Sequence, residues 1–120
     1  MERVIRSSSL TQRFDDSGNL IEETQFLNDV PHGISQLWSS NRVLIGKAEY
    51  KNGKLDGKSR IWDADGQLVI LATYVDGELH GVYRSWWRNG TPKEFGNYER
   101  GDRAPNFTWY NQAGYILNSD

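Results

Sequence analysis

Residues 50–57 read YKNGKLDG, and residues 74–81 read YVDGELHG. Each stretch begins with Tyr and carries Gly three and seven residues later. The same pattern begins again at Phe26 and at Tyr98, although one Gly is replaced in each of these copies. The four leading aromatics are 24 residues apart, and recurrence at such a fixed interval indicates a repeat protein.

A second aromatic follows each leading aromatic after 12 residues. These second aromatics are Trp38, Trp62, Trp86 and Tyr110. Gly lies four residues further on in three of the copies, with Arg42 as the exception. Phe14 and Gly18 extend the pattern upstream. We therefore interpret residues 1–120 as one repeat domain, with a half repeat at 10–25 and repeats starting near 26, 50, 74 and 98.

The segments between the glycines have the character of strands. KSRIWD at 58–63 and QLVILATY at 67–74 are short and rich in aromatic and β-branched residues. Two turn signals alternate between such segments: Asp65-Gly66 predicts a tight hairpin, and the two glycines of 52–57 predict a wider turn. The prediction is an all-β fold, an open antiparallel meander of stacked β-hairpins in a single twisted sheet of about nine or ten strands. Residues 1–9 are expected to be a frayed lead-in.

Composition excludes several classes of protein. The 120 residues include 14 Lys plus Arg, 16 Asp plus Glu and no Cys, with a formal net charge of -2. This balance argues against nucleic-acid binding, and the lack of Cys excludes disulfides, thiol nucleophiles and thiolate metal sites. The N-terminus has no apolar signal core, and the longest aliphatic run is residues 68–72. We therefore expect a cytoplasmic protein without stable membrane insertion.

Two stretches carry a family resemblance. They are residues 50–58 followed by Trp62 and Asp65-Gly66, and residues 74–83 followed by Trp86 and Asn89-Gly90. Both resemble the bacterial variant of the MORN repeat, the variant named for antitoxin-repeat proteins of toxin–antitoxin systems. The resemblance covers residues 14–117 and weakens toward the ends, where Asp29, Arg42 and Pro105 stand in Gly positions.

The resemblance implies a function as well as a fold. It implies stacked hairpins without catalysis or cofactor. It also implies an antitoxin or immunity protein that binds a cognate toxin, encoded by a neighbouring gene, and neutralises it by occlusion.

Strand alternation divides the side chains between two faces. The second aromatics define the anchor face, and the positions next to them define the variable face. Aromatics on the variable face occur only in its C-terminal half, where Phe95 and Tyr115 are also expected. Because exposed aromatic patches favour binding, we predict that Tyr83, Trp87, Phe107 and Trp109 are partner anchors, with Asp63 and Glu94 as rim charges.

Other interpretations stay open. The same aromatics could instead form a core, either by packing against the C-terminal tail or because the variable face is the buried one, or they could stack against a ligand. Residues 61–120 carry five Lys or Arg against eight Asp or Glu. This acidic half suits a basic partner through electrostatic steering, whereas an ordinary solvated surface is the simpler explanation.

The two histidines do not form a metal or acid–base pair. His32 and His80 occupy the same repeat position two repeats apart, which places them about 19 Å from each other across four strand spacings. Asp56 fills the same position between them, so we interpret it as a polar turn position. No nucleophile–base set is apparent, and we expect no enzyme, metal site or cofactor site.

A second function class remains. The basic cluster Lys47, Lys51, Lys54, Lys58 and Arg60 favours a MORN-type scaffold or a protein that binds lipid headgroups. An open sheet also has two unpaired edges, so an edge-to-edge homodimer is a further expectation.

Overall fold

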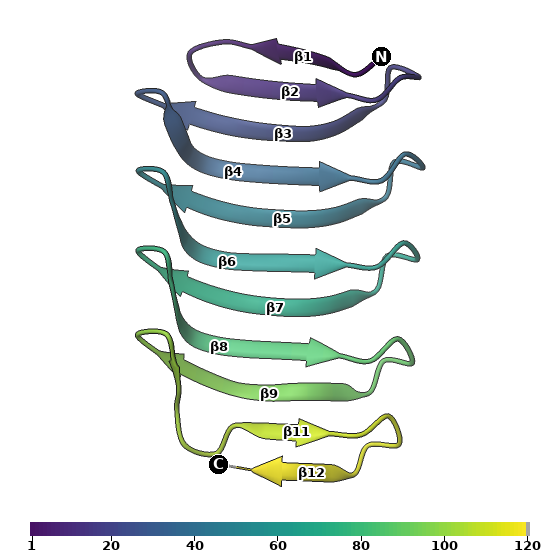
Figure 1. Ribbon diagram of the computed structural model, residues 1–120, viewed down its shortest axis with the longest axis vertical. Helices are drawn as coiled ribbons and strands as arrows, with labels where there is room; N and C mark the ends of the chain where they lie inside the picture. The colour runs from purple at the N-terminus through teal and green to yellow at the C-terminus, as the bar shows by residue number, and fades with distance from the viewer. Residues whose placement is uncertain (120) are drawn as a thin grey trace.

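The computed structural model describes residues 1–119, which form one antiparallel sheet of twelve strands. The strands are β1 Arg3–Arg6, β2 Leu10–Phe14, β3 Leu20–Leu27, β4 Val30–Trp38, β5 Leu44–Lys51, β6 Lys54–Trp62, β7 Leu68–Val75, β8 Glu78–Trp86, β9 Pro92–Glu99, β10 Asp102–Arg103, β11 Thr108–Tyr110 and β12 Ile116–Ser119. Strands pair in chain order, except that β11 follows β9 (Figure 1). The short β10 pairs with β9 alone. The predicted all-β open meander of hairpins is confirmed.

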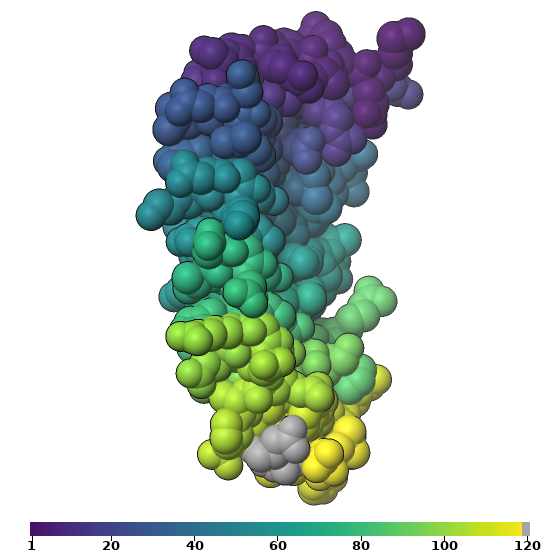
Figure 2. Space-filling view, turned by 60° about the vertical axis from the view of Figure 1, so that its left-hand side comes forward, coloured from purple at the N-terminus to yellow at the C-terminus, as the bar shows by residue number. Residues whose placement is uncertain are grey.

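The sheet is a single layer with a small, local core. Its principal extents are 46 × 31 × 15 Å, and residue number increases steadily along the long axis (Figure 2). Among the side chains described, only Ala72, Ser85 and Phe107 are buried, and all three lie on the variable face in the C-terminal half. None of residues 1–119 forms a helix that could cross a membrane.

Two strands lie beyond the upper end of the nine or ten that the sequence predicts. The short β10 is one of them, and β1 is the other. The expectation of a frayed lead-in is wrong for β1, because Arg3–Arg6 pairs with β2 and Ser7 N–H donates to the carbonyl of Leu10 at 2.7 Å. A close turn through the serines therefore returns the chain onto β2 and adds a strand at the N-terminal edge.

The two kinds of turn are the reverse of the prediction. Lys51 pairs with Lys54, and the two residues between them, Asn52 and Gly53, have φ of 52° and 85°. Two successive positive φ angles define the tight type I′ hairpin. The Asp65-Gly66 dipeptide instead ends a longer loop, in which only its Gly has positive φ. Both sites carry a dipeptide that favours a tight turn, so the dipeptide alone could not rank them.

The second glycine of the repeat lies within a strand and not in a turn. Gly57 is in β6 with φ 111°, opposite an irregularity in the pairing with β5. The Glu49 carboxylate crosses to this point and accepts a hydrogen bond from the Lys58 N–H at 2.7 Å. A Cβ on Gly57 would overlap that carboxylate. Backbone conformation and space therefore both require Gly.

Neighbouring repeats are joined at the edge that carries the tight turns. The N–H of Gly53 donates to the carbonyl of Pro31 at 2.8 Å, and Gly77 and Gly101 make the equivalent bonds to Leu55 and Leu79 at 2.7 and 2.8 Å. Each tight turn is therefore hydrogen-bonded to the hairpin before it, as expected when a repeat contacts only its neighbours.

The strand register confirms the division into two faces. Tyr83 lies opposite Gly96 and Ser85 opposite Glu94 on the variable face, whereas Arg84 lies opposite Phe95 on the anchor face. Placing Phe95 on the variable face was therefore wrong. Its ring packs edge-on against Trp86 and Tyr110, at centroid distances of 5.7 and 5.9 Å.

Candidate functional site

The aromatic residues of the variable face form one cluster around Phe107. The Phe107 ring lies 6.0 Å from Tyr83, 5.4 Å from Tyr98 and 4.8 Å from Trp109, measured between centroids. Its exposed fraction is 0%. Phe107 therefore has a packing role in the core, as the alternative interpretation allowed, and does not offer its ring to a partner.

The absence of a side chain at Gly96 makes this packing possible. A Cβ there would overlap the Phe107 ring and crowd its backbone. The chain reaches this position through an irregular loop, in which Ala104 N–H donates to the carbonyl of Asn97 at 2.9 Å and Asn106 has φ 71°. The loss of the repeat Gly at Pro105 accompanies this detour.

Trp109 and Tyr83 lie at the surface of the cluster and are partly exposed. The Arg103 guanidinium lies 5.0 Å from the centroid of the Trp109 ring. The same Trp109 ring also packs against Phe107. Tyr83 packs edge-on against Tyr98 at 5.4 Å. Their positions are therefore fixed by a buried support, which favours binding because little side-chain freedom remains to be lost.

Glu94 is the carboxylate that belongs to this cluster. It pairs with Ser85 on one side and Trp109 on the other, and its Oε1 accepts a hydrogen bond from the Ser85 hydroxyl at 2.8 Å. Burial raises the pKa of Tyr83 to about 12, and the charge of Glu94 acts in the same direction. Burial also raises the pKa of Tyr98, although the Arg103 charge opposes the rise. Both phenols are thus neutral hydrogen-bonding groups at physiological pH.

Trp87 and Asp63 occupy the same repeat position with different roles. The Asp63 Oδ1 accepts hydrogen bonds from Asp65 N–H at 2.9 Å and Gln67 N–H at 3.0 Å, so it caps its own turn. Trp87 instead donates from Nε1 to the carbonyl of Tyr110 at 3.1 Å and carries the Lys93 ammonium 4.7 Å from its ring centroid. The structure thus ties Asp63 to turn formation, while Trp87 remains a partly exposed aromatic beside the cluster.

Four further acidic residues of the C-terminal half gather elsewhere. Asp76, Glu78, Glu99 and Asp102 lie on or beside the tight turns. Asp76 lies 4.0 Å from the Lys54 ammonium of the preceding turn. The acidic surface therefore belongs mainly to that edge of the sheet.

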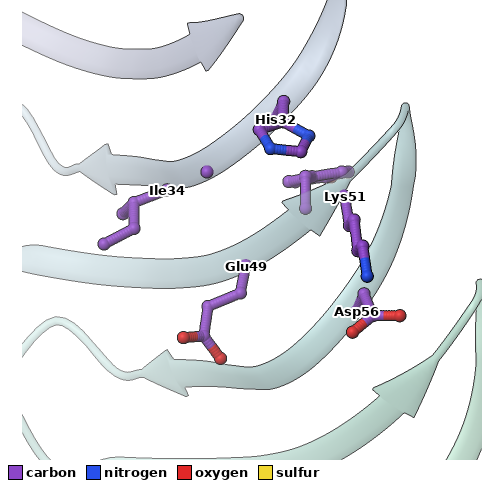
Figure 3. A pocket seen from close by; sticks show the side chains of 7 residues that line it. His32, Ile34, Glu49, Lys51 and Asp56 are labelled. Carbon is purple, nitrogen blue, oxygen red and sulfur yellow. The ribbon is translucent and has the colours of Figure 1, made fainter. Parts of the chain in front are cut away.

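A surface hollow of about 290 Å³ lies between the first two tight turns, lined by His32, Glu49, Lys51 and Asp56 among others (Figure 3). The His32 Nδ1 accepts a hydrogen bond from Asn52 N–H at 3.1 Å. A similar hollow recurs around His80. It follows that these hollows come from the stacking of tight turns.

The position shared by the two histidines is a cap for the next turn. Asp56 Oδ2 accepts from Asp76 N–H at 3.0 Å, and His80 Nδ1 accepts from Arg100 N–H at 3.2 Å. The position is polar as predicted, but it lies within a strand and caps the tight turn of the following repeat instead of forming part of a turn itself. Within residues 1–119, no group of three or more His, Asp or Glu side chains is arranged to hold a metal ion.

Sequence reasoning missed three members of the cluster. Tyr98 is a leading aromatic, and its side of the sheet could have been derived from its even spacing to Gly96 along β9. Gly96 occupies the repeat position of Ala48 and Ala72, so its smaller size was a visible signal. Arg103 occupies the repeat position of Leu55 and Leu79, which lie opposite Tyr50 and Tyr74, so the repeat interval could have placed it opposite Tyr98.

The fold defines a repeat protein built from sequential hairpins in one open sheet. The family model described as MORN repeat variant matches residues 55–76 and 79–100, so the chain carries a MORN repeat variant domain. The predicted resemblance to this repeat is confirmed. The family match does not test the antitoxin role, which stays a prediction.

One solved structure, described as the crystal structure of TarM, is similar over 86% of this chain, with 14% identity and a TM-score of 0.49. The chain spans 20% of that protein's length. No curated protein sequence matches at a significant level.

Proposed function

We propose that this chain is a binding protein of the antitoxin or immunity type, which neutralises a cognate toxin domain by covering its active site. The observation that carries the proposal is the C-terminal cluster, in which partly exposed Tyr83 and Trp109 rest on the buried Phe107. Rigid aromatics of this kind dominate binding hot spots. Trp87 donates a hydrogen bond to the carbonyl of Tyr110, the residue after Trp109, and Glu94 adds a negative charge to the cluster.

The test is co-expression with the product of the neighbouring gene, with an affinity tag on this chain alone. A stable complex, together with toxicity of the neighbour expressed by itself, would support the proposal. A harmless neighbour that does not co-purify would contradict it.

The charge of Glu94 allows a sharper test of the surface. In Glu94→Gln the amide oxygen can still accept the Ser85 hydrogen bond, so the fold is retained while the charge is removed. We expect slower association with the partner, most clearly at low salt. Glu99→Gln is the matched control, because Glu99 lies beside a tight turn. Equal effects of the two variants would show that only overall charge matters.

The structure gives less support to the scaffold or lipid-headgroup alternative. Lys47, Lys58 and Arg60 share the anchor face, whereas Lys51 and Lys54 flank a tight turn. The five cations therefore do not form one continuous surface. Co-sedimentation with anionic vesicles would decide this alternative, because an antitoxin has no reason to sediment with them.

A further inference from the structure

Four cations gather on the anchor face, away from the aromatic cluster. Lys47 lies directly opposite Arg60 across β5 and β6. Arg60 lies opposite Leu71, and Leu71 lies opposite Arg84, so the row continues across β7 to β8. Lys58 shares the face because it precedes Arg60 by two residues on β6. We call Lys47, Lys58, Arg60 and Arg84 the cationic patch.

The patch is not neutralised within the chain. Among the residues that the structure describes, no carboxylate lies within ion-pair distance of any of these four cations. Glu49 is on the same face, and its Oε2 is hydrogen-bonded to the backbone N–H of Lys58. One nearby carboxylate against four cations leaves the patch positive, on a protein whose formal net charge is -2.

The repeat does not require these cations. The position of Lys47 is held by Glu23, Leu71 and Phe95 in the other copies. The position shared by Arg60 and Arg84 is held by Gln36 and Thr108. Like charges placed directly opposite each other across two strands destabilise a sheet. The Lys47–Arg60 pair therefore opposes folding, and neither the repeat pattern nor an ion pair compensates for it.

We propose that the cationic patch binds an acidic, extended segment of a partner protein. Carboxylates at alternate positions of an extended chain are about 6.6 Å apart on one side, which is also the spacing of Lys58 and Arg60 along β6. Leu71 lies between Arg60 and Arg84, so the patch also offers an apolar contact. This surface is on the face opposite the aromatic cluster, and it does not rest on the proposed antitoxin function.

The observations favour a protein segment over other polyanions. Lys58 and Arg84 are exposed, whereas Lys47 and Arg60 are only partly exposed, and a patch with recessed cations suits a narrow chain better than the flat surface of a membrane. Phe95 packs against Trp86 and lies under the Arg84 guanidinium at 4.8 Å, so it offers no free ring face to a nucleic-acid base.

The test uses a short fluorescent peptide of alternating Glu and Leu, with a Gln–Leu peptide as the neutral probe. Binding is measured by anisotropy with the whole chain at low salt. We expect the double variant Lys47→Gln, Arg60→Gln to weaken binding of the acidic peptide about tenfold. The matched control is Lys51→Gln, Lys54→Gln, which removes the same charge at the tight turn and should change affinity less than about twofold.

Several results would overturn the proposal. Equal losses in the two double variants would mean that only bulk charge attracts the peptide, and no binding by the unaltered chain would exclude the site. Tighter binding of a single-stranded oligonucleotide, or of vesicles containing phosphatidylserine, through the same residues would assign the patch to those partners instead. Amide shifts confined to β5–β8 on adding the peptide would place it on the patch and support the proposal.

Discussion

The variable face repeats the same strand register in its two halves, but its side chains fill the space over the sheet to different degrees. Near the middle of the chain, Ala48 lies opposite Ser59, and both side chains are too small to cover the sheet. Two repeats further along the chain, Gly96 occupies the position of Ala48 and lies beneath Phe107. Ile61 is 44% exposed in the first region, whereas Phe107 is 0% exposed in the second. A single-layer sheet thus has a core only where large side chains meet small ones.

The largest effect should come from removing the ring that fills the C-terminal half. Phe107→Ser should lower the free energy of unfolding by about 3–5 kcal/mol, because Tyr83, Tyr98 and Trp109 lose their common contact. Denaturation followed by tryptophan fluorescence would measure this loss. A loss below about 1 kcal/mol would mean that the cluster is not a core.

The repeat supplies a control for that substitution. Gly96→Ala alone should destabilise by about 1–3 kcal/mol, because the new Cβ overlaps Phe107. Combined with Phe107→Ser, it recreates the Ala48–Ser59 pair of the middle repeats. The double variant should then be no less stable than Phe107→Ser alone. Full additivity of the two losses would show that the contact between these residues is not the cause.

Alkaline pH should weaken the same half of the molecule. The Tyr83 pKa rises from 10.0 to about 12 on folding, because burial and Glu94 disfavour the phenolate. Below about pH 10 the phenol is neutral in both states and the stabilisation is complete. Between about pH 10 and 12 the unfolded chain ionises first, so stability falls by at most about 2 kcal/mol for a partly exposed ring.

Tyr83→Phe separates this effect from the titration of Lys and of other Tyr side chains. The variant should lose less stability than the unaltered chain over the same pH range. Equal pH dependence in urea denaturation of the two proteins would contradict the assignment to Tyr83.

The repeat interval and strand alternation made most of the fold predictable. The interval fixed the hairpins, and alternation put Tyr83 and Trp109 on the variable face, as the register confirms. The turn types were not predictable, because Asn52-Gly53 and Asp65-Gly66 carry equivalent signals and only the pairing distinguishes them. The burial of Phe107 was not predictable either, because it depends on the irregular loop before this residue and on the space above Gly96.

A smaller effect should appear at the edge that joins the repeats. His80→Ala removes the acceptor for the Arg100 N–H and should destabilise by about 0.5–1.5 kcal/mol. His80→Asp should lose less stability than His80→Ala, because Asp56 caps the preceding turn through the same kind of bond, but the added charge near Asp76 and Glu78 should prevent full recovery. Faster amide exchange at Arg100 in the Ala variant alone would localise the loss. Equal destabilisation by Ala and Asp would show that the imidazole ring is needed for packing.

The smallest expected effect has the opposite sign. Lys47→Gln removes one member of the Lys47–Arg60 pair and should stabilise the sheet by about 0.2–1 kcal/mol, which corresponds to a rise in Tm of about 1–4 °C. Lys54→Gln is the control, because Lys54 faces Asp76 at 4.0 Å and its removal should bring no gain. Added salt should reduce the difference between Lys47→Gln and the unaltered chain, since screening weakens the same repulsion. A fall in Tm for Lys47→Gln would mean that the lysine stem packs on the anchor face, and the argument that this charge pair opposes folding would then fail.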